Sequence, residues 1–175
     1  MPRRSVVFML PAMLAVAFVG ARHSSSAEKS QSSDVRNHFL GTWKLVSAED
    51  TMKDGSTRPY PDTGPHGLGY LMYTPDGHMC ANLMNPDRPK WDVPPTAAQK
   101  VAAIEGMAAY CGTFKIDEIN HVMLHYPEVA WMPNYVGTEQ RRPYKFEGNH
   151  LSFSGPGQSD EPDVAQWTIT WEKVK

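Results

Sequence analysis

The sequence predicts an all-β protein: an eight-stranded antiparallel up-and-down barrel with one helix inserted between strands 3 and 4. Eight short runs of strand-type sequence follow one another, mostly through tight turns, and only one stretch has the composition of a helix. The first run opens with Gly41 and Trp43, which suggests a large ring that plugs one end of a small barrel. Eight strands leave room inside for side chains and one small ligand.

The first predicted strand, residues 41–50, directs Trp43, Leu45 and Ser47 to one face. A loop rich in Gly, Pro and Asp follows at 51–66, and we expect it to cover the mouth of the barrel. Strands 67–74 and 77–84 form a hairpin around Thr74-Pro75-Asp76-Gly77, because Pro and Gly suit the two ends of a tight turn.

Thr96 is a suitable N-cap for the predicted helix, residues 97–109, which also could cover the mouth. The segment 127–134 is expected to be irregular. The remaining strands are predicted at residues 111–116, 121–126, 136–146, 150–154 and 165–174.

The N-terminus predicts an export signal at residues 1–27, with Arg3 and Arg4 before an apolar run and small residues at the cleavage site. The alternative is an uncleaved anchor, but the apolar run of about 15 residues is short for a membrane span. We therefore expect a secreted or periplasmic protein, with a flexible leader at 28–37 and one barrel domain at 38–175.

The charge balance argues against several classes of partner. Three arginines and no acidic residue would leave with residues 1–27, so the formal net charge would fall from −2 to −5. A mildly acidic barrel is a poor candidate for nucleic acid, or for a membrane surface after signal cleavage. The sequence has no nucleophile elbow, phosphate-binding loop or dinucleotide fingerprint, and we predict no cofactor. The oligomeric state stays open.

The two cysteines, Cys80 and Cys111, leave two alternatives. An oxidising compartment permits a disulfide. However, both residues lie near the beginnings of consecutive predicted strands, and the start of one antiparallel strand lies opposite the end of the next. This placement favours two small buried hydrophobic residues over a bond that needs Cα atoms within about 7 Å.

Several motifs, spaced in order between residues 38 and 173, resemble those of the lipocalin-like domain family. They are LGTWKLVS at 40–47, GYLMYTPDG at 69–77, Leu83-Met84, YCGTF at 110–114, and PNYVGTEQ at 133–140 followed by Arg142. The resemblance implies a lipocalin-type barrel with an internal cavity. Some members of that family lie in natural-product gene clusters, which implies small-molecule binding or cyclisation chemistry.

Strand 136–146 carries the strongest candidate for ligand contact. If Tyr144 and Phe146 face inward, the period of two turns Gln140 and Arg142 inward as well. A guanidinium inside a cavity could bind a carboxylate, enolate or phenolate. The alternatives are an internal ion pair with Glu139 or Glu128, or a register shift at Pro143 that leaves Arg142 on the surface.

Two histidines, His121 and His125, lie four residues apart. On one strand they would be about 13 Å apart, which is too far for a shared metal ion, and we predict no metal site. His125 could transfer a proton, or it could be a half-exposed histidine at the barrel rim that binds a loop carbonyl.

Tyrosine and methionine side chains supply the candidate walls of the cavity, or simply fill the core. The candidates are Tyr70, Met72, Tyr73, Met123 and Tyr144, although Tyr73 has the opposite parity to Tyr70. Trp167, Ile169 and Trp171 are expected in the core.

Three functions fit these residues. The first is an exported barrel that binds a small apolar molecule with one polar or anionic group, oriented by Arg142 and Gln140. The second is a cyclase, isomerase or hydratase that uses the same cavity, with His125 moving a proton and Arg142 stabilising negative charge. The third is a protein-interaction module with Trp131 and Met132 in an exposed apolar patch, which a solid interior would favour.

Overall fold

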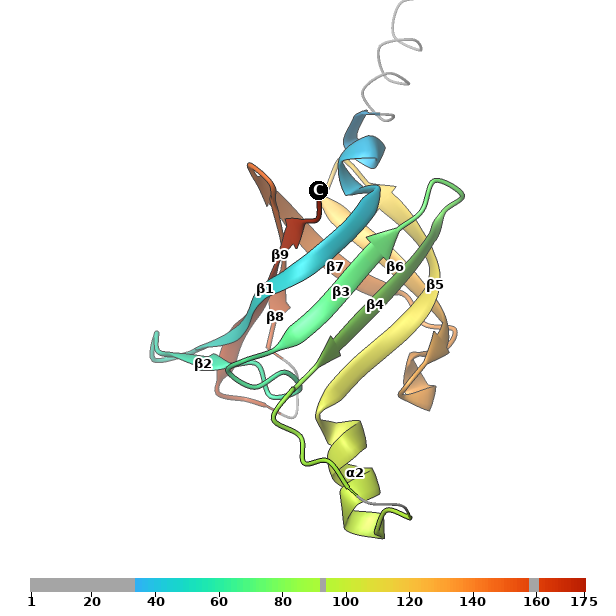
Figure 1. The fold of residues 1–175 in the computed structure, drawn as a ribbon. Coiled ribbons are helices and arrows are strands. Elements are labelled where there is room, and N and C mark those ends of the chain that lie inside the picture. Colours follow the sequence, from blue (N-terminus) through green and yellow to red (C-terminus); the bar gives the residue numbers. More distant parts are fainter. Residues whose placement is uncertain (1–33, 92–93, 158–160) are drawn as a thin grey trace, which may run out of the picture.

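Eight antiparallel strands close into a barrel, as predicted (Figure 1). The structure is a computed structural model and describes residues 34–91, 94–157 and 161–175. The barrel strands are β1 (Gly41–Met52), β3 (Leu68–Tyr73), β4 (His78–Met84), β5 (Met107–Asp117), β6 (Val122–Ala130), β7 (Gln140–Glu147), β8 (His150–Pro156) and β9 (Val164–Lys173). Each pairs with the next, and β1 pairs with both β3 and β9, which closes the sheet.

Shorter elements are attached to this barrel. The three-residue strand β2 (Thr57–Pro59) lies within the predicted loop 51–66 and pairs with the end of β1, although no strand was predicted there. The described residues form helices at 34–39, at α2 (Ala97–Glu105) and at the 3-10 turn η1 (Pro133–Tyr135). None of the described helices is long and apolar enough to span a membrane. The predicted signal, residues 1–27, lies outside the described residues.

Aromatic side chains close the barrel at the end where β1 begins. The helix 34–39 lies over this end (Figure 1) and places Phe39, which is fully buried, against the rings of Tyr144 and Phe146. The Trp43 ring is 2% exposed, and its indole N–H donates to the Phe39 carbonyl at 2.8 Å. The predicted plug is therefore a Trp43–Phe39 pair. Residues 34–37 of the predicted leader 28–37 belong to this helix.

Gly41 is required at the start of β1 because its φ is +113°, a conformation that side chains with a Cβ rarely adopt. A Cβ there would lie 3.5 Å from the Lys173 side chain, which is an ordinary contact. The backbone conformation, rather than a close crossing of the chain, accounts for this glycine.

A bulge in β1 corrects one prediction about its inner face. Trp43 and Leu45 are buried as expected, but the register shifts between Leu45 and Ser47. A bulge inserts one residue and reverses the alternation beyond it. Ala48 and Asp50 are buried in consequence, whereas Ser47 is not.

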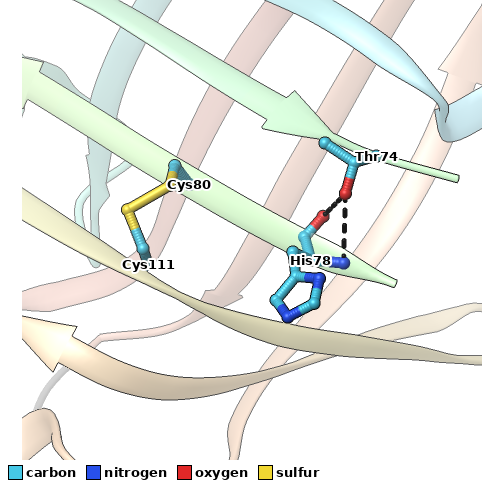
Figure 2. Close-up of a disulfide and its surroundings, with 4 residues drawn as sticks. All are labelled: Thr74, His78, Cys80 and Cys111. Carbon is cyan, nitrogen blue, oxygen red and sulfur yellow. Dashed lines mark hydrogen bonds between the residues drawn. A yellow bond between two sulfur atoms is a disulfide. The ribbon is translucent and has the colours of Figure 1, made fainter. Parts of the chain in front are cut away.

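The predicted hairpin of β3 and β4 is confirmed. Its second strand carries Cys80, one of the two cysteines of a disulfide bond (Figure 2). The Thr74 hydroxyl contacts the backbone of His78, and the Gly77 N–H donates to the Thr74 carbonyl at 3.1 Å. Cys80 and Cys111 form a disulfide, so the favoured alternative of two free buried cysteines is wrong. The strand starts were misplaced: β5 begins at Met107, and Cys111 therefore lies directly opposite Cys80.

Other boundaries differ from prediction, and β7 begins at Gln140 rather than at residue 136. Thr96 caps α2 together with Gln99, but the helix ends at Glu105 and residues 107–109 belong to β5, paired with β4. Strand β6 continues through Pro127 to Ala130, where an irregular segment was predicted. The register of β5 and β6 shifts at Cys111/Gly112, and an irregularity of this kind accommodates a proline within a sheet.

Candidate functional site

The barrel encloses a cavity of about 300 Å³ that opens at the end opposite the Trp43 plug. Its inner walls come from alternate residues of the strands, among them Leu71, Ala81, Phe153 and Ile169. Its mouth is bounded by loop residues 60–63, by Trp131, Met132 and Tyr135, and by Glu161. The interior is not packed solid, and Trp131 and Met132, the residues of the predicted interaction patch, lie at the mouth of the cavity, where Met132 is 42% exposed.

Arg142 lies on the inner face of β7 and lines this cavity. Gln140, Arg142, Tyr144 and Phe146 alternate with exposed residues, as the period of two predicts. The Arg142 guanidinium lies 5.3 Å from the centre of the Trp167 ring, and its contacts to the Gln140 side chain and the Arg141 carbonyl are both 3.3 Å long. Burial works against its charge, but the nearby Tyr110 and Tyr135 hydroxyls outweigh that effect and raise its pKa.

The alternative ion pair of Arg142 with Glu139 does not form. Glu139 contacts Arg141 at 2.9 Å and the Tyr126 hydroxyl at 2.9 Å, on the outer side of the strands. Glu128 is exposed. Among the residues that the structure describes, no carboxylate lies within salt-bridge distance of Arg142.

His125 is 1% exposed, so the prediction of a half-exposed histidine at the rim is wrong. Its Nε2 lies 2.7 Å from the Tyr73 hydroxyl and its Nδ1 lies 2.8 Å from the Tyr110 hydroxyl. Burial, and secondly the positive charge of Arg142, hold the pKa of His125 well below its usual value. Because both ring nitrogens of His125 are engaged by tyrosine hydroxyls, neither is free to form a hydrogen bond with a ligand.

The other predicted histidine, His121, is not on β6. It is exposed in the turn before that strand, with a φ of +52°. The two histidines therefore do not lie on one strand, although the sequence predicted that they would.

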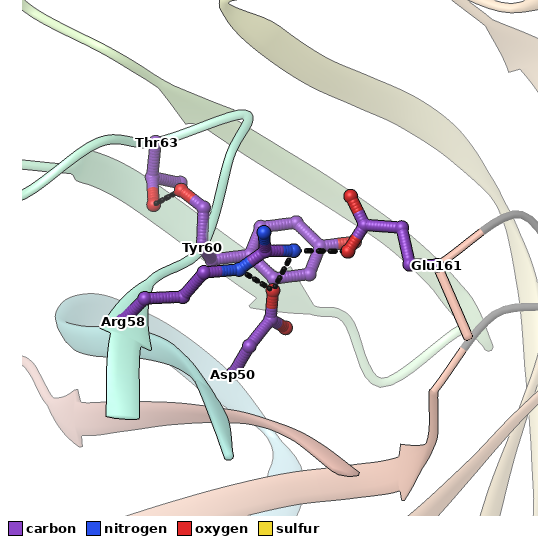
Figure 3. A network of polar contacts seen from close by, with 5 residues as sticks. All are labelled: Asp50, Arg58, Tyr60, Thr63 and Glu161. Carbon is purple, nitrogen blue, oxygen red and sulfur yellow. Dashed lines mark hydrogen bonds and ion pairs between the residues drawn. The ribbon is translucent and has the colours of Figure 1, made fainter. Parts of the chain in front are cut away.

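An ion-pair bridge holds the mouth of the cavity (Figure 3). Arg58 of β2 contacts Asp50 of β1 at 2.9 Å and also contacts Glu161, which follows β8. Asp50 is 1% exposed, and the adjacent Thr63 hydroxyl donates to the Tyr60 carbonyl at 3.1 Å. The bridge joins three segments of the chain and fixes the loop that carries Tyr60 and Asp62. The loop 51–66 covers the mouth, as predicted.

Asp62 is the unpaired acid of the mouth. No described residue forms a hydrogen bond or an ion pair with its carboxyl group. Burial first, and then the negative charges of Glu161 and Asp50, raise its pKa to about 6. It is therefore a carboxylate at neutral pH and takes up a proton in mildly acidic solution.

Trp171 provides an unused donor. Its ring lines the cavity and is 2% exposed, and its indole N–H has no acceptor among the described residues. Buried polar groups nearly always have a partner, so an orphaned donor at a cavity wall is typical of a site that a ligand completes.

The chain matches the lipocalin-like domain family over residues 40–174, which is the whole barrel. It belongs to that family. A search of curated proteins finds no match. Lipocalin-like barrels bind small ligands in general, and the enclosed cavity of this member fits that role.

Only some of the predicted site residues meet in this lipocalin-like cavity. Arg142 and His125 line it. Tyr73 does not line the cavity, but its hydroxyl forms a hydrogen bond with His125. Tyr70 and Met72 are 51% and 42% exposed, so their prediction as cavity walls is wrong: Leu71 and Tyr73 are the inward residues of β3.

Three further candidates do not line the cavity. Met123 is fully buried in the core, and Tyr144 packs against Phe39 at the plugged end. Gln140 is half-buried and contacts Arg142. The helix α2 has no buried residue, and none of its residues lines the cavity, so the prediction that it covers the mouth is wrong.

The sequence did not indicate Tyr110, Tyr135, Asp62 or the indole donor of Trp171 as site groups. The alternation of β5 could have indicated Tyr110. Tyr110, Gly112 and Phe114 lie on one face of the strand, so an inward Phe114 implies an inward Tyr110. The other tyrosine and Asp62 lie in segments without periodicity, where no pattern indicates direction.

Proposed function

We propose that this protein binds a small, largely apolar molecule inside the barrel, with an anionic or strongly polar group of the ligand against Arg142. The observation that carries the proposal is a guanidinium in an internal cavity with no carboxylate partner among the described residues. A buried charge is costly unless it is paired, so an unpaired one in an open cavity is best explained by a ligand that pairs with it.

The surroundings of Arg142 support a ligand with a flat apolar body. Trp131, Tyr135, Phe153 and Trp167 contribute aromatic surface to the cavity, and leucine and isoleucine side chains complete it. A volume of about 300 Å³ is at the small end of ligand sites. A compact aromatic or polycyclic acid therefore fits better than a long lipid.

Calorimetric titration with three probes of similar shape tests this proposal. We expect 2-naphthoate to bind more tightly than 2-ethylnaphthalene, and (2-naphthyl)methylammonium to bind least. Arg142→Met should weaken 2-naphthoate by about 10- to 100-fold, since a hydrogen bond to a charged group contributes about 1.5–3 kcal/mol. The stability of this variant should be unchanged or higher, because an unpaired charge has been removed.

Arg141→Met is the matched control. Arg141 is the neighbouring residue on the outer face and pairs with Glu139, so its removal should leave 2-naphthoate affinity unchanged. Equal affinity of wild type and Arg142→Met for 2-naphthoate would show that Arg142 does not bind the anionic group.

We further propose that the protein is exported after removal of residues 1–27. The Cys80–Cys111 disulfide supports this, because such bonds persist in oxidising compartments. N-terminal sequencing of the protein from its own host tests it: a mature chain that begins near residue 28 is expected, and a chain that retains residues 1–27 would contradict it.

An acid–base enzyme is the second candidate, and Asp62 is the observation that favours it. This unpaired carboxylate and Arg142 line the same cavity. Asp62 could remove a proton from the carbon next to a carbonyl, while Arg142 stabilises the enolate oxygen. Return of that proton to another carbon would give an isomer without any oxidant or reductant.

Deuterium exchange separates this enzyme from a carrier. The methyl protons of 2-acetylnaphthalene should exchange in D₂O faster with the wild type than in buffer, and Asp62→Asn should abolish the difference. If the ketone binds but its methyl protons exchange no faster than in buffer, the acid–base enzyme is contradicted and the carrier remains.

A further inference from the structure

Tyr73, His125 and Tyr110 form a line of hydrogen bonds whose direction can be worked out from proton counting. Two phenolic O–H groups and one N–H of the neutral imidazole supply three protons for two bonds, at 2.7 Å and 2.8 Å. One proton is therefore left over. Its location depends on which ring nitrogen of His125 carries the hydrogen.

Tyr73 has to donate. Its side chain is 2% exposed, does not line the cavity, and is surrounded by Phe39, Phe114 and His125. Its hydroxyl has no hydrogen-bond partner other than His125 among the residues described. If it accepted from Nε2–H, its own proton would be buried without an acceptor, which is the more costly arrangement.

The remaining directions follow from this one. Nε2 accepts the Tyr73 proton, so Nδ1 carries the hydrogen and donates to the Tyr110 oxygen. Burial raises the pKa of Tyr110, and Arg142, the charged residue whose interaction with that phenol opposes the rise, has donors only and cannot accept. Tyr110 lines the cavity, and its proton is the one left over. It is therefore available to a group inside the cavity.

We infer that Tyr110 binds the inner end of the ligand as a hydrogen-bond donor, and that this end is an acceptor oxygen, such as a carbonyl, carboxylate or phenolate. The inference rests on the proposed function, because it names the group that the same cavity receives. Two other polar groups at the cavity agree with it, because the Arg142 guanidinium and the unpartnered Trp171 indole N–H are also donors. Tyr73 and His125 are positioning residues, which fix the Tyr110 proton without touching the ligand.

Nitrogen-15 NMR of the histidine rings tests the proton order without any ligand. The full chain labelled with ¹⁵N-histidine should show His125 as the neutral tautomer with hydrogen on Nδ1, between pH 6 and 8. Assignment uses His125→Gln, in which only that pair of signals should disappear. A His125 ring with hydrogen on Nε2 would overturn the inference.

Binding of two matched naphthalenes tests the role of Tyr110. 2-Acetylnaphthalene has an acceptor oxygen and no donor, and 2-ethylnaphthalene has the same shape without the oxygen. Tyr110→Phe should weaken the ketone by about tenfold, the effect of one ordinary hydrogen bond, and leave the hydrocarbon unchanged. Equal effects on both probes would overturn the assignment of Tyr110.

Tyr73→Phe tests the positioning role. Without the Tyr73 hydroxyl, Tyr110 can turn its proton toward Nδ1, so the ketone should bind about threefold or more weakly, and the tautomer of His125 should change. Tyr126→Phe is the control, because Tyr126 follows His125 on β6 and its hydroxyl donates to Glu139 outside the barrel. Unchanged ketone affinity and tautomer in Tyr73→Phe would overturn the positioning role.

The two proposals can fail separately. A protein that binds neither naphthalene, nor 2-naphthoate, but has hydrogen on Nδ1 of His125 contradicts the proposed function and retains the proton order. A protein that binds 2-naphthoate through Arg142 but has hydrogen on Nε2 retains the function and loses the inference. Urea unfolding of each variant confirms that the Tyr→Phe changes leave the fold intact.

Discussion

Trp43 is the side chain on which the closed end of the barrel depends most. Its ring is 2% exposed, its N–H donates to the Phe39 carbonyl, and the Lys173 ammonium lies 5.1 Å from the ring centre. The ring thus links the helix 34–39, the start of β1 and the end of β9. Its removal leaves a cavity that the rigid strands around it cannot fill.

Trp43→Ala should lower the free energy of unfolding by about 3–5 kcal/mol, the usual range for a large aromatic removed from a core. Urea denaturation measures it. Ile119→Ala is the control, since Ile119 is 91% exposed in a turn and should change stability by less than about 0.5 kcal/mol. A loss below about 1 kcal/mol for Trp43→Ala would contradict its role as the plug.

At the scale of single residues, alternation predicted direction only where the two faces differ in polarity. In β7, Arg141, Pro143 and Lys145 stand between Arg142, Tyr144 and Phe146, so the inner face was evident. In β3 the run Tyr70-Leu71-Met72-Tyr73 is apolar on both faces, and the pattern does not say which one is buried. The prediction of Tyr70 and Met72 as cavity walls was wrong for this reason.

At the scale of the elements, β8 and β9 show how a small residue makes room for the site. Gly155 lies directly opposite Trp167, and a Cβ at Gly155 would come within 2.5 Å of the Trp167 ring. That ring lines the cavity and lies beneath the Arg142 guanidinium. The glycine therefore determines where Trp167, and indirectly Arg142, can lie.

Gly155→Ala should displace the Trp167 ring and weaken 2-naphthoate by several-fold while the barrel stays folded. Titration calorimetry of the purified variant measures the affinity. Ser154→Ala, next on the same strand and outside the cavity lining, is the control and should bind as the wild type does. Wild-type affinity in Gly155→Ala would mean that the position of Trp167 does not matter to the ligand.

The elements that sequence reasoning missed are those where pairing outweighs local propensity. Ala108 and Ala109 were predicted to be helical, but they belong to strand β5 because they pair with Leu83 and Asn82 of β4. Pro127 was predicted to end the strand, but β6 continues through it because the pairing with β5 is irregular opposite Gly112. Strand β2 is three residues long and includes a proline, so only its partner β1 defines it.

At the scale of the whole molecule, the buried His125 and the half-buried Asp62 give opposite pH dependence to stability. His125 has a lowered pKa, so below pH 6.5 the unfolded chain takes up a proton that the folded chain refuses, and stability falls by up to about 1.4 kcal/mol per pH unit. Asp62 has a pKa raised to about 6, so between about pH 6 and 3.8 the folded chain takes up the proton first, and stability rises on acidification.

Asp62→Asn should separate the two effects. The variant should be more stable than the wild type at pH 7.5, because it lacks the disfavoured carboxylate, and this advantage should shrink toward pH 4.5. Its own stability should still fall below pH 6.5, because His125 remains. Urea unfolding of both proteins at a series of pH values measures this, and a difference that does not change with pH would contradict the raised pKa of Asp62.

The most direct test of the ligand site is native mass spectrometry of the protein purified from its own host, as wild type and as Arg142→Met. The account predicts one small molecule bound at a 1:1 ratio to the wild type and absent from the variant, and denaturing release would then give its chemical class. A wild-type protein without a bound molecule, or an equal load on both proteins, would contradict a ligand held in the barrel by Arg142.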